Sequence, residues 1–237
     1  MTLPDGADGE LMRVLTDFAL RVGTPYEVTD ALHDLVDDVI CVLGVSGAGV
    51  SLGDGDTVSF ATAVPAEIAA VERAQEEAQS GPCIEAHRTG TSVLVPDLAD
   101  CPHRWPALTE AAASVGVVAV AGIPVRIEDN RLGALDLYDR RRRDWDREVV
   151  EAATVLAGLA ASYIANASRV DRLRHTAEQL QEALNGRVLI EQAKGILAGE
   201  RGITVDQAFE QLRAHARRNG ASLRSIADAV VTLGLRP

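Results

Sequence analysis

Apolar residues recur every three or four positions over residues 10–22 and 26–43, which predicts two amphipathic helices at the start of the chain. In the second helix, Asp30, Asp34 and Asp37 occupy the opposite face, and Gly44 ends the helix. Its apolar positions are Val28, Leu32, Leu35, Val36, Val39, Ile40 and Leu43. Each helix therefore offers one face to a core and exposes an acidic face.

The pattern then changes to short β-prone runs. "SGAGVSL" and "TVSFATA" flank the turn cluster "GDGD", which predicts a hairpin. Pro65 opens a helix that runs to about Gln79 and is stopped by "SGP". A strand in "TSVLVPDL", a loop with a short helix, and two strands in "VVAVAGIPVRI" and "LGALDLYD" follow, the last two joined by "EDNR". These elements predict an α+β or α/β sandwich around one sheet.

From Trp145 the helical pattern continues for about 50 residues. A heptad assignment places Val149, Leu156, Tyr163, Val170, Ala177 and Leu184 at position a, and Ala152, Leu159, Asn166, Leu173 and Leu180 at position d. A seam of this length is typical of a coiled coil and predicts a homodimer, in which Asn166 would fix the register. The alternative is packing on the chain's own sheet, and we expect the first half to cover the sheet and the second half to pair two chains.

The last 50 or so residues predict a small bundle of three helices. "RVLIEQAKGILAGE" is closed by Gly202, and "TVDQ" is a capping box that starts the second helix at Thr204. Asn219-Gly220 ends the second helix and Ser222 caps the third. The expected inward positions are Val205, Ala208, Phe209, Leu212, Ala216, Leu223, Ile226, Ala227, Val230 and Leu233.

Charge separates the end of the chain from the rest. The whole chain of 237 residues has a net charge of -12, but residues 185–237 hold 8 basic and 5 acidic residues. A basic segment on an acidic protein favours local binding of a polyanion. Lys194 is the only lysine, and all other basic residues are arginines. The lone lysine is either chance in an arginine-biased composition or a site that needs a compact ammonium and not a guanidinium fork.

Other features of the composition favour a cytosolic protein. No apolar run reaches the ~18 residues that span a bilayer, and the acidic "MTLPDGADGE" is no secretory signal. We therefore expect no membrane partner. Cys41, Cys83 and Cys101 are few and odd in number, which fits reduced thiols that are buried and inert.

The C-terminal segment resembles the ANTAR domain, the RNA-binding module of transcription antitermination regulators. The family pattern has an Arg, an Ile-Glu-Gln-Ala-Lys-Gly run, a Gly-rich turn, an Ala-Phe…Leu-Arg helix and a final helix with an Ile-Ala pair. Here these are Arg187, Ile190 to Gly195, Gly202, Ala208-Phe209, Leu212-Arg213 and Ile226-Ala227. The resemblance implies a dimeric antitermination regulator that binds paired RNA stem-loops.

"SGPCIEAHRTGTSVLVPDLADCPHRWPAL" and "GIPVRIEDNRLGALDLYDRRRRDWD" resemble the GAF domain, a sensor of small molecules or signals. The expected fold class is therefore α+β: a GAF-like antiparallel sheet with helices, then a long helix or coiled coil leading into the bundle. The expected domains are an N-terminal extension (1–25), a GAF-like sensor (26–168), a coiled-coil linker (169–184) and an ANTAR bundle (185–237).

The candidate RNA-binding residues lie on the outward face of the bundle. RNA loops are bound through phosphate contacts, base edges and stacking, and the basic residues here supply such groups. The candidates are Arg187, Glu191, Lys194, Gly195, Arg213, Arg217, Arg218, Arg224 and Ser225. The alternative is a solvated face with ion pairs such as Arg187–Glu191. Candidates for binding an unknown small-molecule effector are Cys83, Asp97 and Trp105, and we expect no other cofactor.

Other sequence patterns give weaker indications of function. Cys83 with His87 and Cys101 with His103 have loose spacing for a metal, so we expect none. "RRRR" (140–143) is either a second polyanion contact or a solvated turn with ion pairs. No catalytic constellation is found, so we expect no enzyme. The alternatives are a thiol enzyme of the free methionine sulfoxide reductase type and a protein–protein signalling module, in which the acidic body could dock the basic segment.

Overall fold

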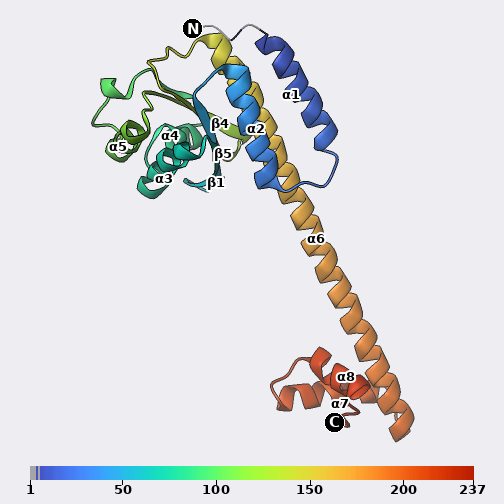
Figure 1. Ribbon diagram of the computed structural model, residues 1–237. Helices are drawn as coiled ribbons and strands as arrows, with labels where there is room; N and C mark the ends of the chain where they lie inside the picture. The colour runs from blue at the N-terminus through green and yellow to red at the C-terminus, as the bar shows by residue number, and fades with distance from the viewer. Residues whose placement is uncertain (1–3, 5) are drawn as a thin grey trace. The chain divides into compact units, whose positions relative to one another are not determined.

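The computed structural model describes residues 4 and 6–237, and it divides into two compact units, Met1–Arg169 and Val170–Pro237 (Figure 1). Residues 1–3 and 5, at the start of the predicted N-terminal extension, lie outside the described residues. Each unit has its own hydrophobic core. One helix, α6 (Arg147–Arg201), contributes its first part to the N-terminal unit and its last part to the C-terminal unit.

The N-terminal unit is built on a five-stranded antiparallel sheet with the order β2-β1-β5-β4-β3. Its remaining elements, in chain order, are α1 (Ala7–Arg21), α2 (Val28–Leu43), β1 (Gly47–Asp54), β2 (Thr57–Val64), the short helix η1 (Ala66–Ile68), α3 (Ala69–Ala78), α4 (Pro82–Thr89), β3 (Val93–Val95), the short helix η2 (Leu98–Asp100), α5 (Pro106–Val115), β4 (Ala119–Ile127) and β5 (Asn130–Asp139). The expected α+β class is confirmed.

Helices cover both faces of this sheet. Because side chains alternate along a strand, Leu135 and Leu137 of β5 enter the core beneath α2 and α6. Tyr138 points to the other face, toward the core that holds Trp105 of the α5 region. Figure 1 shows α2 and α6 on one side of the sheet and α3, α4 and α5 on the other. Residue 136 of β5 consequently faces α3 and α4.

Among the described residues, α4 is an α-helix that the sequence pattern did not predict. The segment "SGP" does stop α3, but Pro82 is the first residue of α4 and opens that helix at once. Proline is favoured in a first helical turn because it has no N–H to leave unpaired. The helices at the N-terminus, the hairpin around "GDGD" and the strands β3 to β5 lie where they were predicted.

The first part of α6 packs on the sheet, as expected, with Val149, Leu156 and Tyr163 buried in the same core as α2. The role given to Asn166 is wrong. Its side-chain amide donates to the backbone carbonyl of Val22 at 3.3 Å and to the Tyr26 hydroxyl at 3.1 Å, so it binds its own chain.

The C-terminal unit consists of the end of α6, α7 (Val205–Arg218) and α8 (Leu223–Thr232). The predicted capping box is present: Gln207 N donates to Thr204 Oγ1 at 3.2 Å, and Thr204 N donates to Gln207 Oε1 at 3.0 Å. Ser222 caps α8, and Gly220 takes the left-handed conformation that follows α7. The three-helix bundle is therefore formed as expected, with its first helix continuous with the long α6.

Two residues predicted to face inward are exposed. Leu233 is 83% exposed and Val205 46% exposed, because they lie at the ends of their helices, where no third helix covers them. The buried core of the bundle consists of Ala193, Leu197, Ala208, Leu212, Ala216, Ile226, Ala227 and Val230. Alanines allow these short helices to approach closely, so a small core is sufficient to hold them together.

Among the described residues, α6 is the one helix long and apolar enough to cross a membrane by length and composition. It meets this criterion through its most apolar 18-residue stretch, which is not an uninterrupted apolar run. Half of that stretch is buried inside the protein. Core helices pass the same test, and the first part of α6 is the core helix of the N-terminal unit.

Candidate nucleic-acid interface

Lys194 is largely enclosed by its neighbours. Its Nζ donates to both carboxylate oxygens of Glu191, at 3.0 and 2.9 Å, and lies 5.3 Å from the centre of the Phe209 ring. The Lys194 side chain is 14% exposed to solvent. A cation over an aromatic face gains electrostatic stabilisation. Lys194 therefore positions Glu191 and the ring of α7, and its ammonium is already paired in this conformation.

The Phe209 ring also receives Arg213, whose guanidinium carbon is 5.7 Å from the ring centre. Arg213 donates to Glu210 at 3.1 Å. Phe209 is thus half-buried and flanked by two basic side chains, which corrects its placement in the core. Two cations already lie over the Phe209 ring, which limits the room for a base to stack on it.

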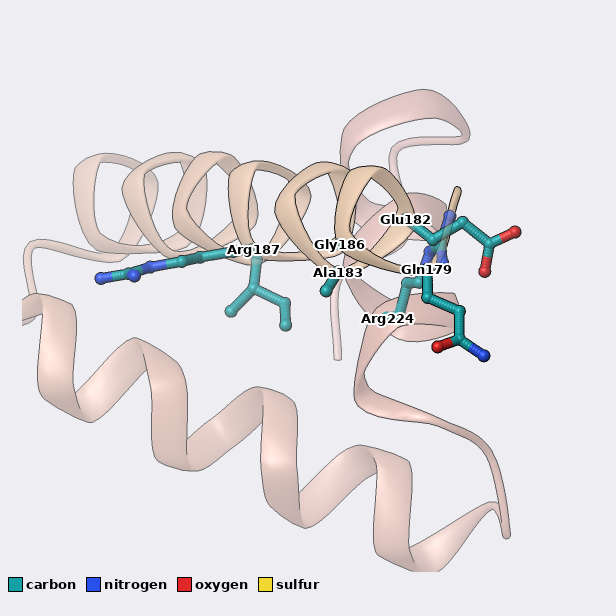
Figure 2. Close-up of a pocket in the computed structure, with 7 residues that line it drawn as sticks. Gln179, Glu182, Ala183, Gly186, Arg187 and Arg224 are labelled. Atoms are coloured by element: carbon teal, nitrogen blue, oxygen red, sulfur yellow. The ribbon is translucent and has the colours of Figure 1, made fainter. Parts of the chain in front are cut away.

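A groove of about 490 Å³ lies in the C-terminal unit between α6 and the start of α8 (Figure 2). It is lined by Gln179, Glu182, Ala183, Gly186, Arg187, Ile190 and Arg224. A Cβ atom at Gly186 would lie 3.4 Å from Arg224 Cδ, so the glycine lets this arginine lie close to α6. Figure 2 shows the Arg187 side chain extending away from Gln179 and Glu182.

Four candidate arginines are available for new contacts. Among the described residues, no hydrogen bond or ion pair is formed by the guanidinium groups of Arg187, Arg217, Arg218 and Arg224. Arg201 and Arg236 differ, because Arg201 donates to Gln211 and to the Pro237 carbonyl, and Arg236 pairs with Glu200. A guanidinium presents donors in a fork that matches a phosphate. These four side chains are therefore suited to binding a polyanion.

The sequence did not predict the groove. Arg187 and Arg224 were both predicted on the RNA-binding face, and the structure brings them to one groove, whereas Lys194 lies outside it. Gln179, Glu182 and Gly186 were missed, although residues three and four apart on one helix share a face. Ser225 donates its backbone N–H to the Ser222 cap, and the two hydroxyls are 2.9 Å apart. Gly195 is exposed on α6.

The three residues proposed for effector binding have structural partners in the N-terminal unit. Asp97 caps η2 through the Ala99 N–H at 2.9 Å, and the Trp105 indole donates to Glu85 at 3.0 Å. Trp105 and Cys83 belong to different packing clusters. The structure therefore does not bring these residues together as one site.

The thiols are not all buried, contrary to expectation. Cys83 is buried, Cys101 is half-buried and Cys41 is exposed. The His87 ring contacts a backbone group, since its Nε2 lies 2.9 Å from the carbonyl oxygen of Gly55. Burial raises the pKa of the Cys83 thiol well above its usual value, and the nearby Asp136 and Glu72 raise that pKa further. This thiol consequently has little thiolate character at neutral pH.

The "RRRR" run is a structural junction with one buried arginine. Arg140 pairs with Glu67 and Arg142 with Asp100, each at 2.8 Å, as expected for a solvated turn. Arg143 is 4% exposed, donates to Asp139 at 2.8 Å and also binds the Leu43 carbonyl. The turn therefore joins β5 to the end of α2, and it is not solvated throughout.

Comparison with known proteins matches these two parts of the chain. The GAF domain family matches residues 27–164, and the ANTAR domain family matches residues 178–231. The chain therefore belongs to the GAF domain family and carries a GAF sensor domain. An ANTAR domain, the RNA-binding antitermination module, follows it. No curated protein sequence matches this chain.

Solved structures show the same fold for the first part. The GAF domain of an Acinetobacter phosphoenolpyruvate-protein phosphotransferase is 14% identical, has a TM-score of 0.54, and the match covers 68% of this chain and 94% of that one. The corresponding Coxiella burnetii domain is 16% identical with a TM-score of 0.53, covering 69% and 97%. Free methionine-R-sulfoxide reductase from Neisseria meningitidis is 17% identical with a TM-score of 0.51, covering 68% and 91%. At these identities the likeness concerns the fold.

Proposed function

We propose that this protein is a signal-responsive, cytosolic transcription antitermination regulator that binds paired RNA stem-loops as a homodimer. The observation that carries the proposal is the set of four guanidinium groups that have no partner among residues 4 and 6–237, in the segment that matches the ANTAR family. Residues 185–237 hold three more basic than acidic residues, whereas residues 1–184 hold 15 basic and 30 acidic ones. Repulsion by the acidic part directs a polyanion to the ANTAR domain.

The proposed RNA contacts divide into two kinds. Arg187, Arg217, Arg218 and Arg224 would bind phosphates or stack on exposed bases through their planar groups. Lys194 and Arg213 would act mainly through Phe209 and the acidic residues that they already bind. Because Glu191 satisfies Lys194, an RNA phosphate at this position would have to displace that carboxylate.

The dimer is supported by the apolar stripe on α6 beyond the sheet. Val170, Leu173, Leu180 and Leu184 are 42%, 61%, 67% and 57% exposed, and with Ala177 they continue the heptad pattern. Leucines at successive a and d positions form the seam of a coiled coil. In a parallel pair, each chain would supply one ANTAR domain. Two stem-loops on one RNA would then bind with the avidity that linked sites provide.

The GAF domain would supply the signal. An effector that binds one arrangement of the dimer more tightly than another shifts the dimer toward that arrangement and so changes its affinity for RNA. The coupling free energy between two such sites is about 1–3 kcal/mol in many allosteric proteins. If the seam pairs the chains without effector, RNA binding is constitutive. Measuring RNA affinity with and without candidate small molecules distinguishes these two forms of the proposal.

Two other functions are less well supported. A reductase of the methionine sulfoxide type needs a reactive thiolate, whereas Cys83 is buried with a raised pKa and burial also raises the pKa of Cys101. A docking module for an acidic protein would use the same arginines. In that case, nuclease treatment during purification would leave the complex intact and release no RNA.

Crosslinking tests the proposed function directly. Ultraviolet crosslinking of the full chain to cellular RNA, followed by peptide mapping, should place crosslinks within residues 178–231, on peptides that contain the four unpaired arginines. Sequencing of the bound RNA should return pairs of adjacent stem-loops. Crosslinks confined to residues 27–164, or RNA without stem-loops, would contradict the proposal.

A further inference from the structure

Asp136 lies at the centre of the sheet in the N-terminal unit and is fully buried. Among the described residues, neither of its carboxylate oxygens has a hydrogen-bond partner of ordinary geometry, and the Cys83 thiol is the side chain within reach of them. Burying a carboxyl group without a partner costs several kcal/mol on transfer from water. A fold does not usually retain such a group in its core without a use for it.

Two other acidic groups face Asp136. The ligand atoms of Glu72 on α3, Cys83 on α4 and Asp136 on β5 all lie within 4.8 Å of one another, and each residue is at most 1% exposed. Burial and the repulsion between Glu72 and Asp136 raise the pKa of Asp136 well above its usual range. Burial raises the pKa of Glu72 to about 7. No basic side chain is among the groups that shift these values, so the raised pKa values favour the protonated, neutral forms of the three groups.

Glycines on the neighbouring strands allow this approach. In the sheet, Asp136 lies opposite Gly49 of β1 and Gly122 of β4. A Cβ atom at Gly49 would lie 2.0 Å from Glu72 Oε1, and one at Gly122 would lie 2.6 Å from the Pro82 carbonyl, next to Cys83. Larger residues at either position would push α3 or α4 away from the sheet. The two glycines therefore build the cluster.

Hydrogen bonds orient Glu72 and Cys83 toward Asp136. The Tyr138 hydroxyl donates to Glu72 Oε1 at 3.0 Å, and Ser51 donates to Glu72 Oε2 at 3.2 Å. Gln75 binds both the Tyr138 hydroxyl and the Cys83 N–H, at 3.0 and 3.1 Å. Outer partners of this kind hold metal ligands in place and tune their affinity.

We propose that Glu72, Cys83 and Asp136 form a binding site for a divalent transition metal ion such as Zn²⁺. Two ligand atoms of one tetrahedral zinc ion are about 3.6 Å apart, given bond lengths of about 2.1 Å to oxygen and 2.3 Å to sulfur. The ligand atoms here lie within 4.8 Å of one another, so binding requires the side chains to close in by about 1 Å. A thiolate beside two carboxylates favours Zn²⁺, Fe²⁺ or Co²⁺ over Mg²⁺ and Ca²⁺. The metal replaces the protons of the three groups, which pass to solvent.

Cobalt(II) serves as the probe, because a thiolate bound to Co²⁺ gives a near-ultraviolet charge-transfer absorption. The full chain is produced in medium supplemented with Co²⁺, and a Cys41→Ser/Cys101→Ser double variant leaves Cys83 as the only thiol. We expect one Co²⁺ per chain and the charge-transfer band in both proteins. Cys83→Ser, which keeps Cys41 and Cys101, should lose the band.

Asp136→Asn provides a second variant, since it retains the shape of the side chain and places no charge in the core. Its circular dichroism should match that of the wild-type chain, while its Co²⁺ affinity falls more than about tenfold. Elemental analysis of protein produced with Zn²⁺ should show the same differences. The wild-type chain and the double variant should retain zinc, and Cys83→Ser and Asp136→Asn should contain less. No charge-transfer band in the double variant, a band that persists in Cys83→Ser, or unchanged metal content in a folded Asp136→Asn would each overturn the proposal.

Discussion

Removing the two groove arginines tests the proposed RNA interface. Arg187→Ala/Arg224→Ala deletes half of the four unpaired guanidinium groups and leaves the bundle core untouched. For single-stranded RNA, each neutralised phosphate contributes about -0.7 to the slope of log affinity against log salt. Four contacts give a slope of about -3, so the double variant should show about -1.5. Because the groove is open to solvent, each contact is expected to contribute only about 1 kcal/mol, and affinity should fall about 30-fold.

Filter binding of the full chain to a two-stem-loop RNA over a series of salt concentrations measures both quantities. Arg201→Ala/Arg236→Ala is the matched control, because it removes the same charge from the same domain at side chains already bonded to Gln211, Glu200 and the C-terminus. The control should retain a slope near -3. If both double variants lose the same affinity and the same slope, the contacts are not located at the groove and only net charge matters.

Three further outcomes are expected. Leu173→Asp/Leu180→Asp places charges in the proposed seam, and sedimentation should show a monomer whose GAF domain melts unchanged, whereas a persistent dimer would show that the chains pair elsewhere. Arg143→Ala leaves the Asp139 carboxylate buried without its partner, so urea unfolding should show a loss of about 3–5 kcal/mol, against less than about 1 kcal/mol if the turn is in effect solvated. Lys194→Arg should weaken RNA binding, because the enclosed position over Phe209 suits a compact ammonium, and equal affinity would mean that charge alone matters.

Helix ends and turns could be predicted from the sequence where the residues that determine them are close together in the chain. Thr204 and Gln207 form their capping box because both partners lie within one turn of helix. The hairpin around Gly55 follows from turn residues between β-prone runs. The missed helix α4 shows the limit of this reasoning, since Pro82 both follows a stop signal and begins a helix.

Contacts between distant segments could not be predicted in the same way. Asn166 fits a heptad seam in the sequence, yet its partners Val22 and Tyr26 come from the other end of the domain. The cluster of Glu72, Cys83 and Asp136 joins three elements separated by strand pairing. Cys83 was singled out for its spacing to His87, whereas burial and sheet topology give it carboxylate neighbours.

The candidate RNA-binding residues could be named from the sequence, but their partners in the folded protein could not. The basic residues of the C-terminal segment could be named from the sequence, because charge and helical spacing are local properties. The sequence could not show which of these basic side chains are left without a partner in the folded protein. Lys194 and Arg213 are satisfied by Glu191 and Glu210. Arg213 lies four residues from Phe209 on α7, whereas only the packing of α7 on α6 brings Lys194 beside the Phe209 ring.

The central claim, that one dimer holds two stem-loops, is tested most directly by comparing RNAs with one and with two stem-loops. The wild-type chain should bind the two-loop RNA at least about 100-fold more tightly than either loop alone, as linked sites predict. This preference should disappear in Leu173→Asp/Leu180→Asp, whose affinity for a single loop stays unchanged. Equal wild-type affinity for one and two loops, or a preference that survives in a monomer, would contradict the account.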